Sequence, residues 1–156
     1  MNIELITIGK TEEKYLIEGI AGYTKRLKHY TNFSLEEVPA LKVSKLEFSK
    51  QKEKESDILL AKIADSDFLV LLDENGKMHD SVEFSSFIQA QMNSGRKRIV
   101  FIVGGPFGFS ETIYKRANYK LSLSKMTFSH QMVRLFFVEQ LYRAMTILKG
   151  EKYHHV

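Results

Sequence analysis

Residues 121–156 read LSLSKMTFSHQMVRLFFVEQLYRAMTILKGEKYHHV, and the middle of this segment is among the most apolar parts of the chain. Segments near chain termini are usually polar and poorly ordered, so this one must be held by burial. From about His130 to Leu148, apolar side chains occupy nearly every direction around a helix, and such a helix is buried on more than one side. We expect one side to pack on the protein's own sheet and another on a second subunit.

Two arginines interrupt the apolar helix, and a polar tail follows it. Arg134 and Arg143 could each join an interface ion pair, reach a ligand pocket or contact an RNA phosphate, and the ion pair is the simplest of these roles. The tail contains Tyr153, His154 and His155. A tail of this composition is either disordered or able to close over a nucleobase by stacking and hydrogen bonding.

Strands and helices alternate through the rest of the sequence. Continuous or alternating apolar runs predict strands at residues 3–8, 33–38, 68–73, 98–103 and 121–124. Helical spacing and capping residues predict further helices at about residues 11–30, 44–64, 81–92 and 110–118. The polar stretch 50–57 is interpreted as a solvated helix face, because its charges alternate in sign. The alternation predicts an α/β fold, with a mainly parallel sheet flanked by helices, in a single domain over residues 1–156.

Three predicted strands end in segments suited to a ligand site. These segments are Leu72-Asp73, Gly104-Gly105 and residues 124–127. Ligands of open parallel sheets bind beyond the carboxyl ends of the strands, so these loops converge on one pocket if the strands are neighbours. Backbone groups of residues 122–127 could bond a purine edge or an amino-acid moiety, with Met126 as an apolar wall. Alternatively, this run only caps the long helix, with Ser129 as the N-cap.

The glycine-rich turn GGPFGF at residues 104–109 matches no common nucleotide motif. It has neither the context of a dinucleotide fingerprint nor the Lys-Ser/Thr pair of a Walker A loop. Pro106 also removes an N–H group that a phosphate cradle would use. Dinucleotide and triphosphate sites are therefore disfavoured. What remains is either a tight turn without a ligand or a close backbone approach to a different ligand.

The composition is that of an ordinary globular protein, with 44% apolar and 27% charged residues. The absence of cysteine excludes disulfides, thiolate metal sites and a cysteine nucleophile. His79 and His130 are too isolated to predict a metal site, so we expect no metal. No signal peptide and no membrane-spanning run is recognisable, and we expect a cytoplasmic protein without membrane contact.

The charge is distributed unevenly along the chain. Residues 1–95 carry 12 Lys and Arg against 16 Asp and Glu, a net charge of −4, whereas residues 96–156 carry 11 against 3, a net charge of +8. This asymmetry indicates either a polyanionic partner such as RNA or pairing between the two halves. The candidates for phosphate contact are Arg96, Lys97, Arg98, Lys115, Arg116 and Lys120.

Three blocks of sequence resemble one known family. The segments LLDENG (71–76), FIVGGPFGF (101–109) and 121–155 are similar to the ribosomal RNA large subunit methyltransferase H family, which belongs to the SPOUT class. The resemblance implies methyl transfer from S-adenosyl-L-methionine to N3 of a pseudouridine in 23S ribosomal RNA, in the large subunit or the assembled ribosome. It also implies a homodimer and a C-terminal trefoil knot, which is rare among protein folds.

The resemblance also implies particular site residues. A neutral His154 would take the N3 proton, Tyr153 would stack on or hydrogen-bond the base, and Arg134 or Arg143 would stabilise the developing anion. The cofactor would contact Leu72, Gly104, Gly105, Leu123, Ser124, Lys125, Met126, Thr127, Phe128 and Ser129.

The chain departs from relatives of this family in two places: at Phe107, where some have an acid, and at the final residues, His155 and Val156. Two other interpretations stay open. One is a non-enzymatic dimeric RNA-binding protein of the same fold, and the other is a SPOUT methyltransferase that acts on transfer RNA.

Overall fold

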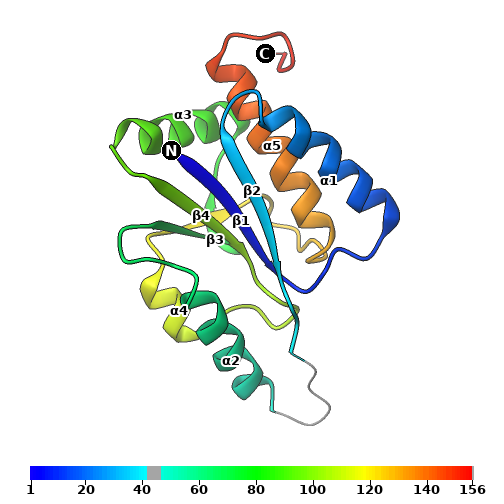
Figure 1. The fold of residues 1–156 in the computed structure, drawn as a ribbon, viewed down its shortest axis with the longest axis vertical. Coiled ribbons are helices and arrows are strands. Elements are labelled where there is room, and N and C mark those ends of the chain that lie inside the picture. The colour runs from blue at the N-terminus through cyan, green and yellow to red at the C-terminus, as the bar shows by residue number, and fades with distance from the viewer. Residues whose placement is uncertain (42–46, 156) are drawn as a thin grey trace.

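The computed structural model describes residues 1–41 and 47–155, so the predicted start of the second helix at Ser44 lies outside the described residues. Strands and helices alternate along the chain (Figure 1). The strands are β1 (Asn2–Ile8), β2 (Asn32–Val38), β3 (Phe68–Met78), β4 (Arg98–Val103) and β5 (Tyr119–Ser122). The helices are α1 (Lys14–Leu27), α2 (Phe48–Leu60), α3 (Ser81–Asn93), α4 (Glu111–Arg116) and α5 (Met132–Leu148).

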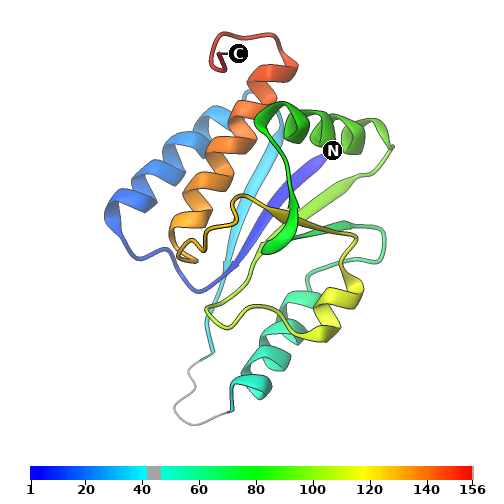
Figure 2. The same cartoon turned by 180° about the vertical axis from the view of Figure 1, so that it is seen from behind.

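The five strands form one parallel sheet in the order β2-β1-β4-β3-β5. Parallel neighbours need crossover connections, and here the helices supply them on both faces. Helices α1, α3 and α5 lie on one face, and α2 and α4 lie on the other, as the two opposite views show (Figures 1 and 2). The predicted α/β fold with a helix-flanked parallel sheet is therefore confirmed.

The core has two layers because successive side chains of a strand point to opposite faces. Leu5 and Phe101 belong to the layer under α1, α3 and α5, where the Phe101 and Phe137 ring centroids lie 4.6 Å apart. Ile6 and Ile102 belong to the layer under α2 and α4. Strand β4 is therefore buried on both faces, as its continuous apolar run predicts.

Strands β3 and β5 make an unusual crossing. Leu121 pairs in parallel with Leu72 and also with Lys77. Strand β5 therefore pairs with β3 both before and after the segment 73–76. A Cβ atom on Gly76 would lie 2.7 Å from the backbone nitrogen of Leu121. Glycine at this position therefore lets two backbones pass in contact. The strand predicted at residues 68–73 is too short, because residues 74–77 are also part of β3.

Helix α5 is buried on the side that faces the sheet, where Phe137 and Leu141 have no exposed surface. Another part of its surface is apolar and open to solvent. Phe136 is 39% exposed and packs on Phe128. Among the described residues, the sheet and helices α1 and α3 cover α5, and the contact with a second subunit stays a prediction.

Two local predictions are wrong. Helix α1 begins at Lys14 rather than directly after Thr11, because the Thr11 hydroxyl donates to Glu37 at 2.6 Å instead of capping the helix. The stretch 50–57 is not wholly solvated, since Glu55 and Ser56 of α2 are buried. The Ser56 and Ser110 hydroxyls lie 2.5 Å apart, so some polar side chains of α2 are buried against the start of α4. The alternating charges of the sequence do not indicate this burial.

Among the described residues, no helix has both the length and the apolar character needed to cross a membrane.

Candidate functional site

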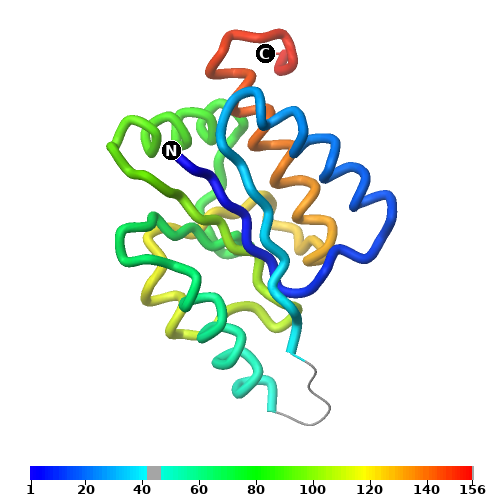
Figure 3. Tube along the Cα trace, viewed as in Figure 1, coloured from blue at the N-terminus to red at the C-terminus, as the bar shows by residue number. Residues whose placement is uncertain are grey.

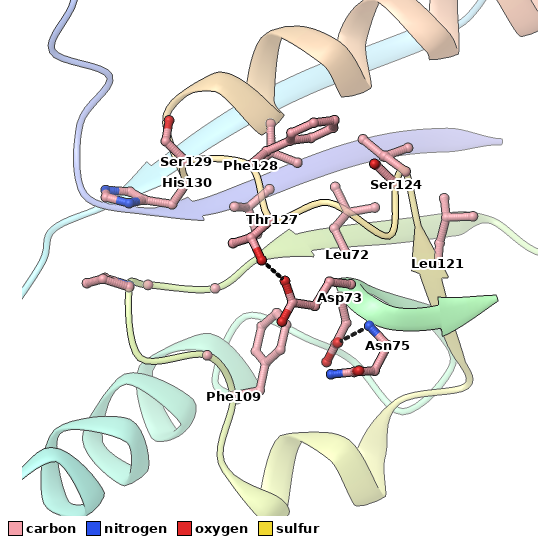
Figure 4. Close-up of a pocket in the computed structure, with 18 of the residues that line it drawn as sticks. Leu72, Asp73, Asn75, Phe109, Leu121, Ser124, Thr127, Phe128, Ser129 and His130 are labelled. Atoms are coloured by element: carbon pink, nitrogen blue, oxygen red, sulfur yellow. Dashed lines mark hydrogen bonds between the residues drawn. The ribbon is translucent and has the colours of Figure 1, made fainter. Parts of the chain in front are cut away.

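A cavity of about 520 Å³ opens at the carboxyl ends of β3, β4 and β5. Its wall combines the end of β3, the glycine-rich turn after β4 and the loop between β5 and α5 (Figure 4). The three predicted strand ends therefore converge on one pocket, as expected from the topology of parallel sheets. Leu72, Val103 and Leu121 supply apolar surface at its base.

The glycine-rich turn lies so close to its neighbours that side chains would not fit there easily. A Cβ atom on Gly104 would lie 3.1 Å from the Phe109 ring, and one on Gly105 would lie 3.0 Å from Glu55 Oε2. Gly108 has φ +75°, a left-handed conformation that favours glycine. The turn thus exposes backbone to the cavity, which suits a ligand that approaches the main chain closely.

The loop between β5 and α5 is shaped by its own serines. The Ser122 hydroxyl donates to the Ser124 carbonyl at 2.8 Å, and the Ser124 hydroxyl accepts from the Met126 N–H at 2.9 Å. Within residues 1–41 and 47–155, the backbone N–H groups of Thr127 and Phe128 donate to no protein acceptor. They are available to bind polar edges of a ligand.

Two carboxylates lie on the opposite wall. Asp73 accepts hydrogen bonds from the Asn75 N–H at 2.8 Å and from the Tyr114 hydroxyl. Glu74 accepts a hydrogen bond from the Thr127 hydroxyl, which joins this wall to the loop (Figure 4). Burial and the Asp73 carboxylate raise the pKa of Tyr114 above its ordinary value, so this hydroxyl remains a donor.

Nine of the ten residues predicted for cofactor contact line this cavity. They are Leu72, Gly104, Gly105, Leu123, Ser124, Met126, Thr127, Phe128 and Ser129. The tenth, Lys125, lines an adjoining recess together with Glu74 and Met78. Met126 is 75% exposed, so its side chain borders solvent rather than forming a closed wall.

Arg134 is placed away from solvent, in a set of protein contacts. Its side chain has no exposed surface and donates to the carbonyls of Ile8, Gly9 and His130 at 2.9–3.0 Å and to the Thr11 hydroxyl at 3.0 Å. Glu37 lies 3.6 Å from the guanidinium. In this geometry Arg134 joins the start of α5 to the end of β1, and four of its five N–H groups have an acceptor among the described residues.

The tail lies at the far end of α5 from the cavity of its own chain (Figure 3). The Tyr153 hydroxyl donates to Glu139 at 3.0 Å and lies 3.1 Å from the Tyr23 hydroxyl. His154 Nδ1 lies 3.3 Å from Arg143 Nη1, and Arg143 donates to Glu139 at 2.5 Å. Arg143 is about 15 Å along the helix from Val133, which lines the cavity. His154 and Tyr153 are therefore together, but not at the cavity of the same chain.

The predicted phosphate contacts divide into two groups. Arg98 forms ion pairs with Glu4 and Asp67. The Arg98 guanidinium lowers the pKa of the Asp67 carboxyl below its ordinary value. Arg116 donates to backbone carbonyls at the start of β3, including that of Asp67 at 3.2 Å. These two arginines hold the fold together. The remaining candidates, Arg96, Lys97, Lys115 and Lys120, are exposed.

In the part of the chain that the structure describes, no group of three or more His, Asp or Glu side chains is placed to hold a metal ion.

Comparison with protein families identifies the class to which this site belongs. Residues 1–154 match the family described as "Predicted SPOUT methyltransferase". The chain belongs to the SPOUT methyltransferase family. Two curated relatives carry the name "Ribosomal RNA large subunit methyltransferase H". The protein of Christiangramia forsetii is 58% identical and that of Flavobacterium johnsoniae 60% identical, each over 156 residues and 99% of both chains.

Solved structures agree on the fold. A probable methyltransferase from Bordetella pertussis Tohama I superposes with a TM-score of 0.57 at 10% identity, over 92% of this chain and 95% of that one. At this identity the similarity concerns the fold alone. It does show that the helix-flanked parallel sheet is shared with another protein across almost the whole length of both chains.

A SPOUT methyltransferase uses S-adenosyl-L-methionine as its methyl donor, and the cavity fits such a cofactor. Its volume of about 520 Å³ falls within the usual range for small-molecule sites, about 300–1,000 Å³. The apolar base, unpaired N–H groups and close glycine backbone match the surfaces of an adenosyl group. The chain is thus an S-adenosyl-L-methionine-dependent enzyme. Its family membership favours this interpretation over that of a non-enzymatic RNA-binding protein.

Sequence reasoning missed several residues of the site. Glu74, Phe109, Tyr114 and His130 line the cavity but were not among the predicted contacts. Glu74 directly follows the buried apolar run of β3, which was a usable signal. Tyr114 is carried by α4 after the glycine turn, and only the folded chain shows that its hydroxyl returns to Asp73.

Proposed function

We propose that this SPOUT methyltransferase methylates N3 of a pseudouridine in 23S ribosomal RNA, acting on the large subunit within the ribosome. The observation that carries the proposal is the 58–60% identity to relatives named for ribosomal RNA large subunit methylation, over 99% of each chain. Identity at this level, spread over the whole chain, supports a common substrate rather than a common fold alone.

The proposed division of labour follows from the cavity. S-adenosyl-L-methionine, when bound, supplies an electrophilic methyl group on a sulfonium sulfur. Leu72 and the loop from Leu123 to Ser129 would bind and orient the cofactor, with the backbone of Gly104 and Gly105 against it and Lys125 at its edge. Orientation of the reacting groups can remove up to about 7–11 kcal/mol of barrier. A base must also take the N3 proton before N3 can attack.

We propose His154 as that base, acting on the cavity of a second subunit in a homodimer. The geometry that supports this is the separation, about 15 Å along α5, between the tail and the cavity of the same chain. The apolar surface formed by Phe136, which is exposed, and by Phe128, which lines the cavity, is suited to subunit contact. Tyr153, held by Glu139, would place the histidine for the partner.

The trefoil knot is part of the same proposal. It is supported by the double pairing of Leu121 with Leu72 and Lys77, so that β5 pairs with both ends of the segment 72–77 of β3. The close approach of Gly76 to the backbone of Lys120 and Leu121 is what a chain threaded past this segment would require.

We further propose a single-domain protein of the cytoplasm that docks on the ribosome through exposed basic residues. Arg96, Lys97 and Lys120 are exposed and form no ion pair within the described residues, whereas Arg98 pairs with Asp67 and Arg116 bonds to the backbone. The net charge of +8 over residues 96–156 is suited to RNA phosphates. A compact chain would rely on the assembled ribosome for much of its docking surface.

Methyl transfer to defined RNA substrates tests the proposal. Purified protein is incubated with S-adenosyl-L-methionine labelled in the methyl group and with assembled ribosomes, isolated large subunits, naked 23S RNA or transfer RNA. We expect label in 23S RNA of ribosomes or large subunits and little in naked RNA. Labelling of transfer RNA with unlabelled ribosomes would favour the alternative substrate instead.

A further inference from the structure

The cavity at the strand ends carries negative charge in a protein of positive net charge. Its lining contains two carboxylates, Asp73 and Glu74, and among its described residues no lysine or arginine. With histidine counted as neutral, the lining has a charge of −2, whereas the whole chain has +4. A small cavity with charge of one sign focuses that field on whatever binds within it.

Both carboxylates are held in place without a cationic partner. Asp73 accepts from the Asn75 N–H and the Tyr114 hydroxyl, and Glu74 accepts from the Thr127 hydroxyl. Neither forms an ion pair within the described ranges 1–41 and 47–155. Neutral donors fix the direction of a carboxylate but leave its charge uncompensated, so both charges act on the cavity.

Two lysines lie nearby but outside the cavity lining. Lys125 shares the adjoining recess with Glu74. The Lys120 ammonium lies 5.6 Å from the centroid of the Tyr114 ring. Both lysine side chains are exposed to solvent, as is Glu74, whereas Asp73 is half-buried, so water and salt screen the Asp73 charge least. Asp73 therefore contributes most to the field inside the cavity, and Glu74 adds a weaker contribution of the same sign.

We propose that Asp73 and Glu74 make the site select the methyl donor over the demethylated product by charge. The proposal rests on the methyltransferase function. The donor carries a sulfonium cation, whereas the product, S-adenosyl-L-homocysteine, has a neutral thioether in the same place and is otherwise identical. Contacts to the adenine, ribose and amino acid are common to both, so a negative wall favours only the donor. Loss of the methyl group removes that attraction and promotes product release.

The expected size of the discrimination follows from Coulomb's law. At effective dielectric constants of about 20–40, a carboxylate about 7 Å from a cation changes affinity by roughly tenfold or more. We use tenfold as the working value for half-buried Asp73 and expect a smaller effect for exposed Glu74. A tenfold change is large enough to resolve by calorimetry and separates clearly from the lesser effect of substituting one polar contact.

Titration calorimetry with three ligands tests the proposal. The ligands are S-adenosyl-L-methionine, sinefungin, which has an ammonium group near the position of the sulfonium, and S-adenosyl-L-homocysteine. The variants are Asp73→Asn, Glu74→Gln and the double variant, which keep shape and hydrogen-bonding atoms. A control, Asp57→Asn with Glu111→Gln, removes the same charge from exposed positions of α2 and α4.

We expect Asp73→Asn to lose about tenfold in affinity for the two cationic ligands and Glu74→Gln to lose less, because Glu74 is exposed, with the affinity for the neutral product unchanged within about twofold in both. The control should bind all three ligands as the unaltered protein does. Equal losses for all three ligands would overturn the proposal, because the carboxylates would then serve groups shared by donor and product. No binding of any ligand to the unaltered, folded protein would instead contradict the cofactor site itself.

Salt dependence of the unaltered protein provides a second test that needs no variant. Raising the salt concentration should weaken binding of the cationic donor more than binding of the neutral product. Parallel curves for the two ligands would count against charge selection even if the variants fold poorly.

Discussion

Replacement of Arg134 by methionine separates a structural from a catalytic role for this buried arginine. The guanidinium donates to three backbone carbonyls and the Thr11 hydroxyl, and its side chain has no exposed surface. Methionine has a similar length but no donor, so these acceptors lose their partner and Glu37 loses the cation 3.6 Å away. Breaking a buried charged network of this kind costs about 3–5 kcal/mol.

Urea denaturation followed by circular dichroism measures this loss. For a chain of this length, 1 kcal/mol of stability corresponds to about 2–4 °C in Tm, so the Tm of the variant in a thermal scan should be lower by roughly 6–20 °C. Lys115→Met, at an exposed residue of α4, is the control and should change stability by less than about 0.5 kcal/mol. Single-turnover methylation, measured well below the Tm of the variant, should stay within a few-fold of normal. A loss below about 1 kcal/mol together with a hundredfold slower transfer would refute the structural role.

Three further changes have defined outcomes. Gly76→Ala should destabilise by about 1–3 kcal/mol in urea, because the new Cβ meets backbone 2.7 Å away, whereas Gly22→Ala, with nothing within 4 Å, should be neutral or stabilising. His154→Ala should slow single-turnover methyl transfer by about 10²–10⁴-fold with unchanged cofactor affinity, and a near-normal rate at saturating RNA and cofactor would exclude it as the base. The pKa of Tyr114 is raised in the folded protein, so its protonated hydroxyl adds fully to the free energy of unfolding below about pH 10, and this stabilisation is lost as the pH rises further. Tyr114→Phe should therefore flatten the decline in the free energy of unfolding above about pH 10.

Local sequence patterns are sufficient to predict the sheet and the place of the site. The apolar run of β4 and the glycine turn after it locate one strand end, and burial on both faces follows from composition alone. The convergence of the ends of β3, β4 and β5 then follows from the neighbour order of the strands. These features depend on residues close together in the chain.

Features that depend on contacts between distant segments were not predictable. The acceptors of Arg134 lie at the end of β1, more than a hundred residues earlier, so no spacing pattern identifies them. Glu55 looks like a surface residue of a charged helix, yet it is buried against the turn at Gly105. The placement of His154 beside Arg143 likewise depends on how the tail folds back on α5.

Mass mapping of 23S ribosomal RNA tests the central claim most directly. RNA is compared from cells with the gene, without it, and with it restored. The account predicts that one pseudouridine in 23S RNA carries a methyl group only when the protein is present, and that nucleoside analysis places this group on N3. An unchanged 23S methylation pattern in cells without the gene would contradict the account.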